Sequence, residues 1–88
     1  MKLLEALVNA ASFTVCPTFS LFGVSSTGEY TLITSYKKAG VFGGSSYRQE
    51  LEHYCTPMVE EFKKQCVEYK FAGLEVRVDG KVVQFNGT

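Results

Sequence analysis

The sequence predicts an α+β fold, in which a four-stranded antiparallel sheet carries helices packed on one face. Three features of the chain favour this fold. An amphipathic helical stripe opens the chain, two strand–turn–strand patterns flank a central helical region, and the second of these patterns contains an Asp-Gly turn. The expected order of elements is α-β-β-α(α)-β-β. The sequence leaves open whether the two hairpins pair within one chain or between two chains.

The first half of the chain is expected to supply one helix and one hairpin. A helix is predicted over residues 2–11, because apolar residues recur along one stripe of period 3.6. The stripe consists of Leu3, Leu4, Leu7, Val8 and Ala11. Strands are predicted over residues 18–25, directly after Pro17, and over residues 30–36. The first of them is apolar on both faces, which indicates a central strand or one covered on both sides.

The central region is expected to be helical in two segments. The first segment runs from about Tyr47 to Cys55, and Thr56-Pro57 is expected to break or kink the helix. A second segment then starts with Thr56 as its cap and Pro57 at its first position. Gly73 suits a left-handed cap at the end of this segment. The buried stripe of the second segment is expected to be Val59, Phe62, Cys66 and Tyr69.

The last part of the chain alternates apolar and polar residues on both sides of Asp79-Gly80, which predicts a hairpin with a two-residue type I′ turn. A two-residue turn fixes the register of the strands. The expected pairs are Val78 with Lys81, Val76 with Val83, and Leu74 with Phe85. One face of the hairpin then carries Leu74, Val76, Val83 and Phe85. The other face carries Glu75, Arg77, Val82 and Gln84.

Length and composition predict a single globular domain over residues 1–88, with 45% apolar and 20% charged residues. Nine basic residues balance nine acidic ones, so no net positive charge favours non-specific binding of nucleic acids. A net charge near zero also weakens repulsion between copies of the chain, which favours homodimerisation. No stretch is apolar enough for a membrane span, and Glu5 and Asn9 interrupt the N-terminal run, which argues against a signal peptide. Three irregularly spaced cysteines favour a reducing, cytoplasmic setting.

The glycine-rich loop between the first hairpin and the central helix is the predicted recognition site. Its sequence places an aromatic side chain among glycines, and no acidic residue lies between Glu29 and Glu50. Exposed aromatic and arginine side chains are typical interface anchors. The residues expected to bind a partner are Tyr36, Lys37, Lys38, Phe42, Tyr47 and Arg48.

The same loop has a second interpretation as a small-anion or nucleotide site. The chain from Gly40 to Ser46 leads into a helix N-terminus, where unpaired N–H groups can hold a phosphate or carboxylate. The binding residues would be Gly43, Gly44, Ser45 and Ser46. However, the segment lacks the Gly-Lys-Ser/Thr end of a P-loop and the spacing of a dinucleotide fingerprint. A plain connector with a helix cap accounts for the same residues.

An enzyme built on cysteine and histidine is a third hypothesis, which the spacing argues against. His53 and Cys55 stand two residues apart, so on a helix they point in different directions. Cys16 and Cys66 would complete a zinc ligand set, but no Cys-x-x-Cys pair is present. We therefore expect no catalytic residue, metal or cofactor.

The sequence as a whole favours a small protein-interaction module that docks on a larger protein. Twelve aromatic residues exceed what one small core needs, so some of them are expected to be exposed. Compact inhibitors or regulators of the phage and mobile-element type are of similar size, which is an analogy of size and not of motif. The identity of the partner is not encoded in any motif of the chain.

Overall fold

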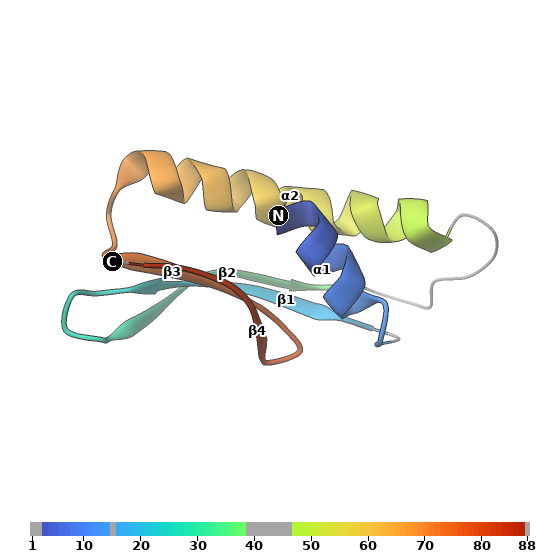
Figure 1. The fold of residues 1–88 in the computed structure, drawn as a ribbon, viewed down its shortest axis with the longest axis horizontal. Helices are drawn as coiled ribbons and strands as arrows, with labels where there is room; N and C mark the ends of the chain where they lie inside the picture. The colour runs from blue at the N-terminus through green and yellow to red at the C-terminus, as the bar shows by residue number, and fades with distance from the viewer. Residues whose placement is uncertain (1–2, 15, 39–46, 88) are drawn as a thin grey trace.

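The computed structural model describes residues 3–14, 16–38 and 47–87 of the chain. Figure 1 shows the arrangement of its helices and strands. In chain order the elements are α1 (Leu3–Ala11), β1 (Thr18–Val24), β2 (Tyr30–Lys37), α2 (Tyr47–Glu68), β3 (Gly73–Val78) and β4 (Lys81–Gly87). The α+β class and the order of the helices and strands along the chain are as the sequence predicts. Neither of these helices combines the length and the apolar character that a membrane span requires.

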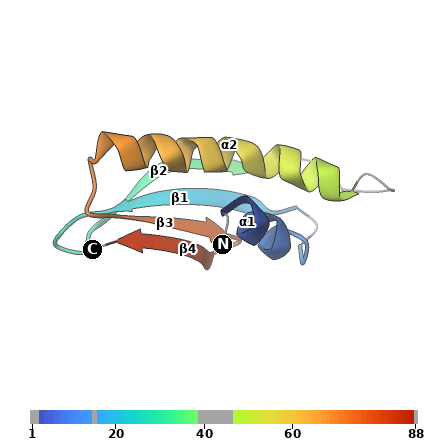
Figure 2. The same cartoon turned by 45° about the horizontal axis from the view of Figure 1, so that its top comes forward.

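All four strands form a single antiparallel sheet in the order β2-β1-β3-β4. The two hairpins join within one chain, because β1 pairs with β3 from Phe19↔Val78 to Val24↔Gly73. Strand β1 is therefore a central strand, as its apolar residues on both faces predict. Strands β2 and β4 are the two edges of the sheet, and Figure 2 shows all four strands side by side.

Both helices lie on the same face of the sheet (Figures 1 and 2). Helix α1 contacts β3 and β4, whereas α2 contacts β1 and β3 and packs along α1. The core fills the space between the two layers. It consists of Leu7, Val8, Ala11, Phe19, Leu21, Leu51, Cys55, Met58, Leu74, Val76 and Val78. Among the described residues no helix covers the opposite face of the sheet, which we call the open face.

Helix α2 runs through Pro57 without a break, so the predicted interruption at Thr56-Pro57 is wrong. A proline inside a helix removes one hydrogen bond and costs about 3 kcal/mol. Leu51 and Met58 are both fully buried, so the helix is docked on the core on both sides of the proline. That burial offsets the cost of the proline. Thr56 does not act as a cap, because its hydroxyl donates to the carbonyl of Glu52 at 2.8 Å.

The end of α2 also differs from the prediction. Tyr69, and not Gly73, adopts the left-handed backbone conformation, with φ of 55°. Its N–H donates to the Gln65 carbonyl at 3.1 Å, so this residue closes the last turn. The backbone changes direction at Tyr69, so the Tyr69 side chain is exposed and does not belong to the predicted buried stripe. Phe62 and Cys66 of that stripe do pack against the core. Gly73 is the first residue of β3.

The turn between β3 and β4 is the predicted type I′ turn, with φ of 52° at Asp79 and 83° at Gly80. Asp79 makes two hydrogen bonds to Thr18, the first residue of β1. Its Oδ1 accepts from the Thr18 N–H, and its N–H donates to the Thr18 carbonyl, each at 2.9 Å. The first predicted pair, Val78 with Lys81, is correct. The two remaining predicted pairs are not formed.

A β-bulge at Val83 changes the register of the hairpin. Arg77 pairs with Val82, but Val76 pairs with Gln84, so Val83 is an extra residue on β4. Val83 packs against the core beneath α1, and every later residue of β4 changes face. As a result Phe85 lies opposite Glu75 on the open face, while Gln84 takes the inner position opposite Val76 that the alternation assigns to Val83.

Strand β2 carries a second bulge of the same kind. Leu21 pairs with Thr34 and Phe22 pairs with Leu32, which leaves Ile33 as the extra residue. Ile33 also packs against the core. Each edge strand therefore holds one bulged, inward-packed aliphatic residue. A bulge interrupts the ladder and twists the strand, so both edges of the sheet are poor templates for a further strand.

Candidate functional site

Two of the residues predicted to bind a partner make internal contacts. The Tyr36 hydroxyl donates to the backbone carbonyl of Tyr54 in α2 at 2.6 Å, and its ring lies 5.1 Å from the ring of Phe19. Burial raises the pKa of Tyr36 to about 12. Lys38 is only 6% exposed, with Nζ 5.3 Å from the centre of the Tyr54 ring. Together these contacts attach α2 to the end of β2.

The other residues of the predicted site are placed as follows. Lys37 is exposed at the end of β2, and Arg48 is exposed in the first turn of α2, 3.8 Å from Glu52. Tyr47 is the first residue of α2. The remaining members lie outside the described residues: Phe42, Gly43, Gly44, Ser45 and Ser46. Docking and anion binding by this loop therefore stay predictions.

Cys55, the buried cysteine, is not an activated nucleophile. Cys55 is fully buried in the core, and burial, assisted by the Glu52 charge, raises the pKa of its thiol to about 12. A thiol with this pKa is protonated at neutral pH and is a poor nucleophile. His53 is exposed, and its ring packs edge-on against Tyr54 at 6.0 Å. Within the described ranges, no three His, Cys, Asp or Glu side chains are grouped closely enough to hold a metal ion.

The open face of the sheet brings together residues from all four strands. One cross-strand row follows the pairing of the strands: Leu32 on β2, Phe22 on β1, Glu75 on β3 and Phe85 on β4. Side chains that are directly opposite on neighbouring strands lie within contact distance of one another. The row therefore forms a continuous band across the sheet, with apolar ends and one carboxylate in the middle.

Glu75 and three neighbouring side chains form a tightly connected group, which we call the Glu75 cluster. Its members are Phe22, Tyr30, Glu75 and Arg77. The Arg77 guanidinium pairs with Glu75 Oε2, and the Tyr30 hydroxyl donates to Glu75 Oε1 at 3.3 Å. The guanidinium carbon lies 4.6 Å from the centre of the Phe22 ring and 5.4 Å from that of Tyr30. The two rings meet edge to face at 6.1 Å.

This arrangement holds each member of the cluster in place. Glu75 is only 5% exposed although it lies on the face without helices, because the neighbouring side chains cover it. Its negative charge is balanced by Arg77, whose guanidinium also makes cation–π contacts with two aromatic rings. The centre of the open face is thus a rigid and electrically neutral group, in which both carboxylate oxygens have partners.

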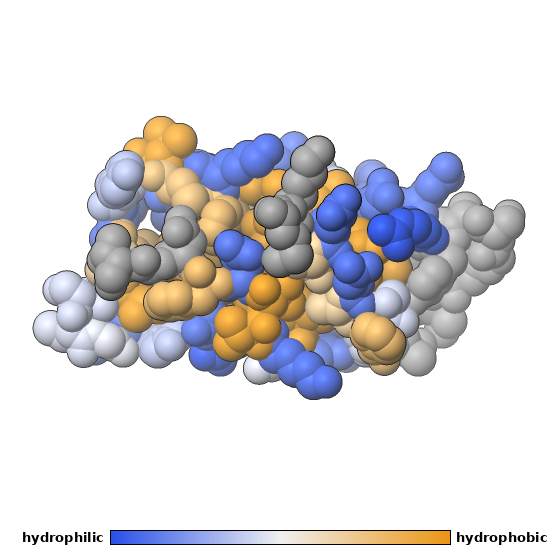
Figure 3. Space-filling view, in the orientation of Figure 1, coloured by the Kyte–Doolittle hydropathy of each residue, from blue (hydrophilic) through white to orange (hydrophobic). Residues whose placement is uncertain are grey.

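The rim of the open face is apolar and accessible. Leu32 and Tyr30 on β2, together with Val82 and Phe85 on β4, are each more than half exposed. They make up most of the large apolar side chains exposed in the described part of the chain; the others are Phe13, Val67 and Tyr69. In the orientation of Figure 3, apolar atoms gather over β4 below the helices. An accessible apolar rim around a neutral aromatic–arginine centre is suited to bind another apolar surface.

Sequence reasoning found part of this surface without identifying it as a site. It placed Glu75, Arg77 and Val82 together on one face of the last hairpin, which the structure confirms. It did not join them to Tyr30 and Phe22, because the order of the four strands cannot be read from local alternation. The available signal was the second apolar face of the strand over residues 18–24, which neither α1 nor α2 covers.

The chain was also compared with known proteins. No protein-family model, no curated protein sequence and no solved structure matches it.

Proposed function

We propose that this chain is a protein-interaction module that binds another protein through the open face of its sheet. The observation that carries the proposal is the half-exposed apolar rim around the Glu75 cluster, on the side of the sheet opposite both helices. A domain of this kind acts by occupying a surface of its partner, which is how an inhibitor or regulator works.

The composition of the open face differs from that of a face that simply meets water. Antiparallel sheets with one solvated face normally alternate apolar residues inside with polar residues outside. Strand β1 follows this rule at Ser20 but not at Phe22, and the edge strands place Leu32 and Phe85 at the two ends of the same row. Phenylalanine, tyrosine and arginine are the residue types enriched at the centres of protein interfaces.

The rigidity of the Glu75 cluster favours binding. Ordering a long, flexible side chain at an interface costs about 0.5–1.5 kcal/mol. Arg77 is already held by Glu75 and by the two rings, so the module loses little side-chain freedom when a partner covers it. Since the pair is neutral as a whole, we expect the matching surface of the partner to be apolar and to carry no excess of either charge.

The bulges favour the face over the edges as the binding surface. A partner that added a strand to β2 or β4 would need a regular row of free backbone groups. Ile33 and Val83 interrupt that row on both edges. Binding on the face needs no backbone hydrogen bonds and uses the side chains that the bulge at Val83 places there, Phe85 among them.

The proposal can be tested by placing a charge on the rim. Leu32→Lys and Phe85→Lys put an ammonium group on each end of the row, whereas Phe13→Lys and Val67→Lys are matched controls. Phe13 and Val67 are 90% and 81% exposed and belong to no strand of the sheet: Phe13 follows α1, and Val67 lies on α2. Each variant is used to capture partners from a lysate of the native cell, and bound proteins are quantified by mass spectrometry.

We expect one partner to be retained by the wild-type chain and by both controls, and to be lost from both rim variants. Burying an unpaired ammonium group under the partner costs about 2 kcal/mol or more, which corresponds to about a 30-fold loss of affinity. Light scattering on the same proteins determines whether the partner is a second copy of the chain. Equal capture by rim variants and controls would refute the proposal.

A further inference from the structure

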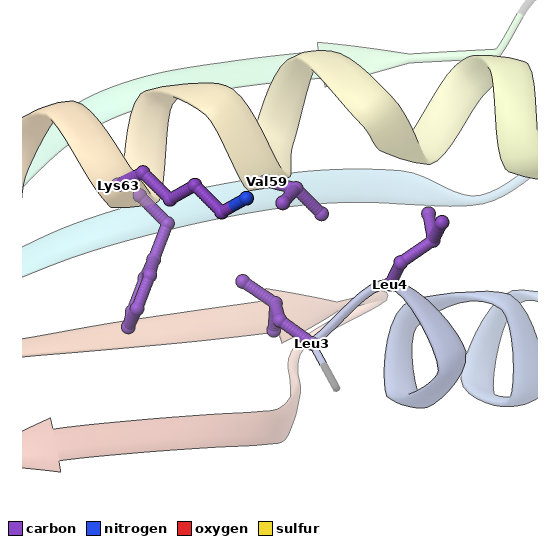
Figure 4. A pocket seen from close by; sticks show the side chains of 5 residues that line it. Leu3, Leu4, Val59 and Lys63 are labelled. Carbon is purple, nitrogen blue, oxygen red and sulfur yellow. The ribbon is translucent and has the colours of Figure 1, made fainter. Parts of the chain in front are cut away.

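A second feature of the molecule lies on the helical side, away from the open face. A groove of about 480 Å³ opens between the start of α1 and the middle of α2. Its lining is formed by Leu3, Leu4, Val59, Phe62 and Lys63. Figure 4 shows Leu3 and Leu4 directed toward α2, with Val59 and Lys63 on the facing helix. The volume lies within the range of about 300–1,000 Å³ that is typical of small-molecule sites.

The groove exists because the two helices are in close contact along only part of α1. Leu7 and Val8, one turn further along, are fully buried, whereas Leu3 and Leu4 are only half-buried. On α2 the facing residues Val59 and Phe62 are half-buried as well. Four apolar side chains therefore line a space that the described part of the chain does not fill.

The charge at the groove is a single lysine. Within the described residues, the ammonium groups of Lys63 and its neighbour Lys64 have no ion pair or hydrogen bond, whereas Arg48 and Lys70 each pair with a glutamate. Of the two free lysines, Lys63 alone lines the groove. A lysine ammonium is a compact point charge that pairs with one anionic group. An apolar lining with one unpaired cation matches a ligand that has an apolar tail and one negative charge.

We propose that this groove binds a free fatty acid, with the alkyl chain against Leu3, Leu4, Val59 and Phe62 and the carboxylate on Lys63. Each methylene group that the alkyl chain buries strengthens binding about fourfold. Because Lys63 is exposed, its ion pair with the carboxylate strengthens binding at most about fivefold. Affinity comes from the tail, and selectivity for a negative head comes from Lys63.

The experiment uses monomeric decanoate, kept below its micelle concentration, and decanol as a neutral ligand of the same length. Binding is measured by calorimetry, and the site is located by methyl NMR of the leucine and valine side chains. Lys63→Met keeps an apolar side chain of similar reach but removes the charge. Lys64→Met is the matched control, because Lys64 is the exposed neighbour of Lys63 and does not line the groove.

We expect saturable decanoate binding, with methyl shifts at Leu3, Leu4 and Val59. Lys63→Met should weaken decanoate binding about fivefold and leave decanol binding within twofold, whereas Lys64→Met should change neither. Leu3→Gln should weaken the binding of decanoate and of decanol by the same factor. Absence of decanoate binding, methyl shifts elsewhere, or equal effects of the two lysine variants would overturn the proposal. Association with phosphatidylcholine–phosphatidylglycerol vesicles without saturable decanoate binding would also overturn it, because the site would then serve a membrane surface.

Discussion

Gly23 lies near the end of the central strand β1, and alanine at this position would collide with Phe71. A Cβ atom added to Gly23 would lie 2.4–2.5 Å from three atoms of the Phe71 ring, where ordinary contacts begin at 3.4 Å. The ring would have to move by about 1 Å, and it packs against the core. Overpacking of this kind costs about 1–3 kcal/mol. In the opposite direction, alanine in a strand stabilises the fold by about 0.5–1 kcal/mol relative to glycine. We therefore expect Gly23→Ala to lower the free energy of unfolding by up to about 2.5 kcal/mol.

The assay is urea denaturation of Gly23→Ala in the wild-type chain and in the Phe71→Ala background. Without the ring the new methyl group meets no obstacle, so the substitution should become neutral or stabilising, with a coupling energy of at least 1 kcal/mol. Gly28→Ala is the control. Gly28 has φ of 88° and open space around it, so its cost is backbone strain and should be the same in both backgrounds. If Gly23→Ala destabilises both backgrounds equally, the packing of Phe71 on β1 is incorrect.

Three further predictions concern the sheet. Phe85→Thr should lower the free energy of unfolding, measured by urea denaturation, by less than about 2 kcal/mol, because Phe85 is 54% exposed on the open face. A decrease of about 3–5 kcal/mol would place Phe85 in the core and contradict the bulge. Asp79→Asn should reduce the loss of stability in acid. The hydrogen bond from the Thr18 N–H lowers the pKa of Asp79, so its charged form stabilises the fold above the ordinary pKa of about 4, and this stabilisation disappears as the pH falls through the lowered value. Stability curves of the two proteins that stay parallel from pH 7 to pH 2 would exclude this role. Tyr36→Phe should cost about 1 kcal/mol, because it removes the hydrogen bond to the Tyr54 carbonyl, and an unchanged unfolding midpoint would show that this bond contributes nothing.

Much of the fold follows from local patterns in the sequence. The stripe of α1, the central position of β1 and the type I′ turn at Asp79-Gly80 each depend on residues that are close together in the chain. Periodicity and turn chemistry determine such features without reference to the rest of the molecule. For this reason the α+β class and the order of the elements could be predicted.

The features that sequence reasoning missed are those that depend on distant contacts. Pro57 is tolerated in α2 because buried residues dock the helix on both sides of it, and a propensity argument has no access to that docking. The bulge at Val83 forms because the inner side of β4 packs beneath α1. Alternation alone therefore assigned Phe85 to the core face, although its side chain belongs to the open face.

The candidate surface was missed for the same reason. The Glu75 cluster joins Tyr30 and Phe22 to residues more than 40 positions later in the chain, as in the Tyr30–Glu75 hydrogen bond across 45 residues. Aromatic composition indicated that some rings are exposed, but it directed attention to the loop around Phe42. Only the order of the strands shows that rings from the first hairpin and the ion pair of the second share one face.

The most direct test of the open face as a docking surface is photo-crosslinking in the native cell. A benzophenone analogue of phenylalanine replaces Phe85 in one protein and Phe13 in another, and neither position is buried. We predict that irradiation joins position 85 to one discrete protein and that position 13 gives no such product. Crosslinking of the same protein from position 13 and not from position 85 would contradict the proposal that this module binds through its open face.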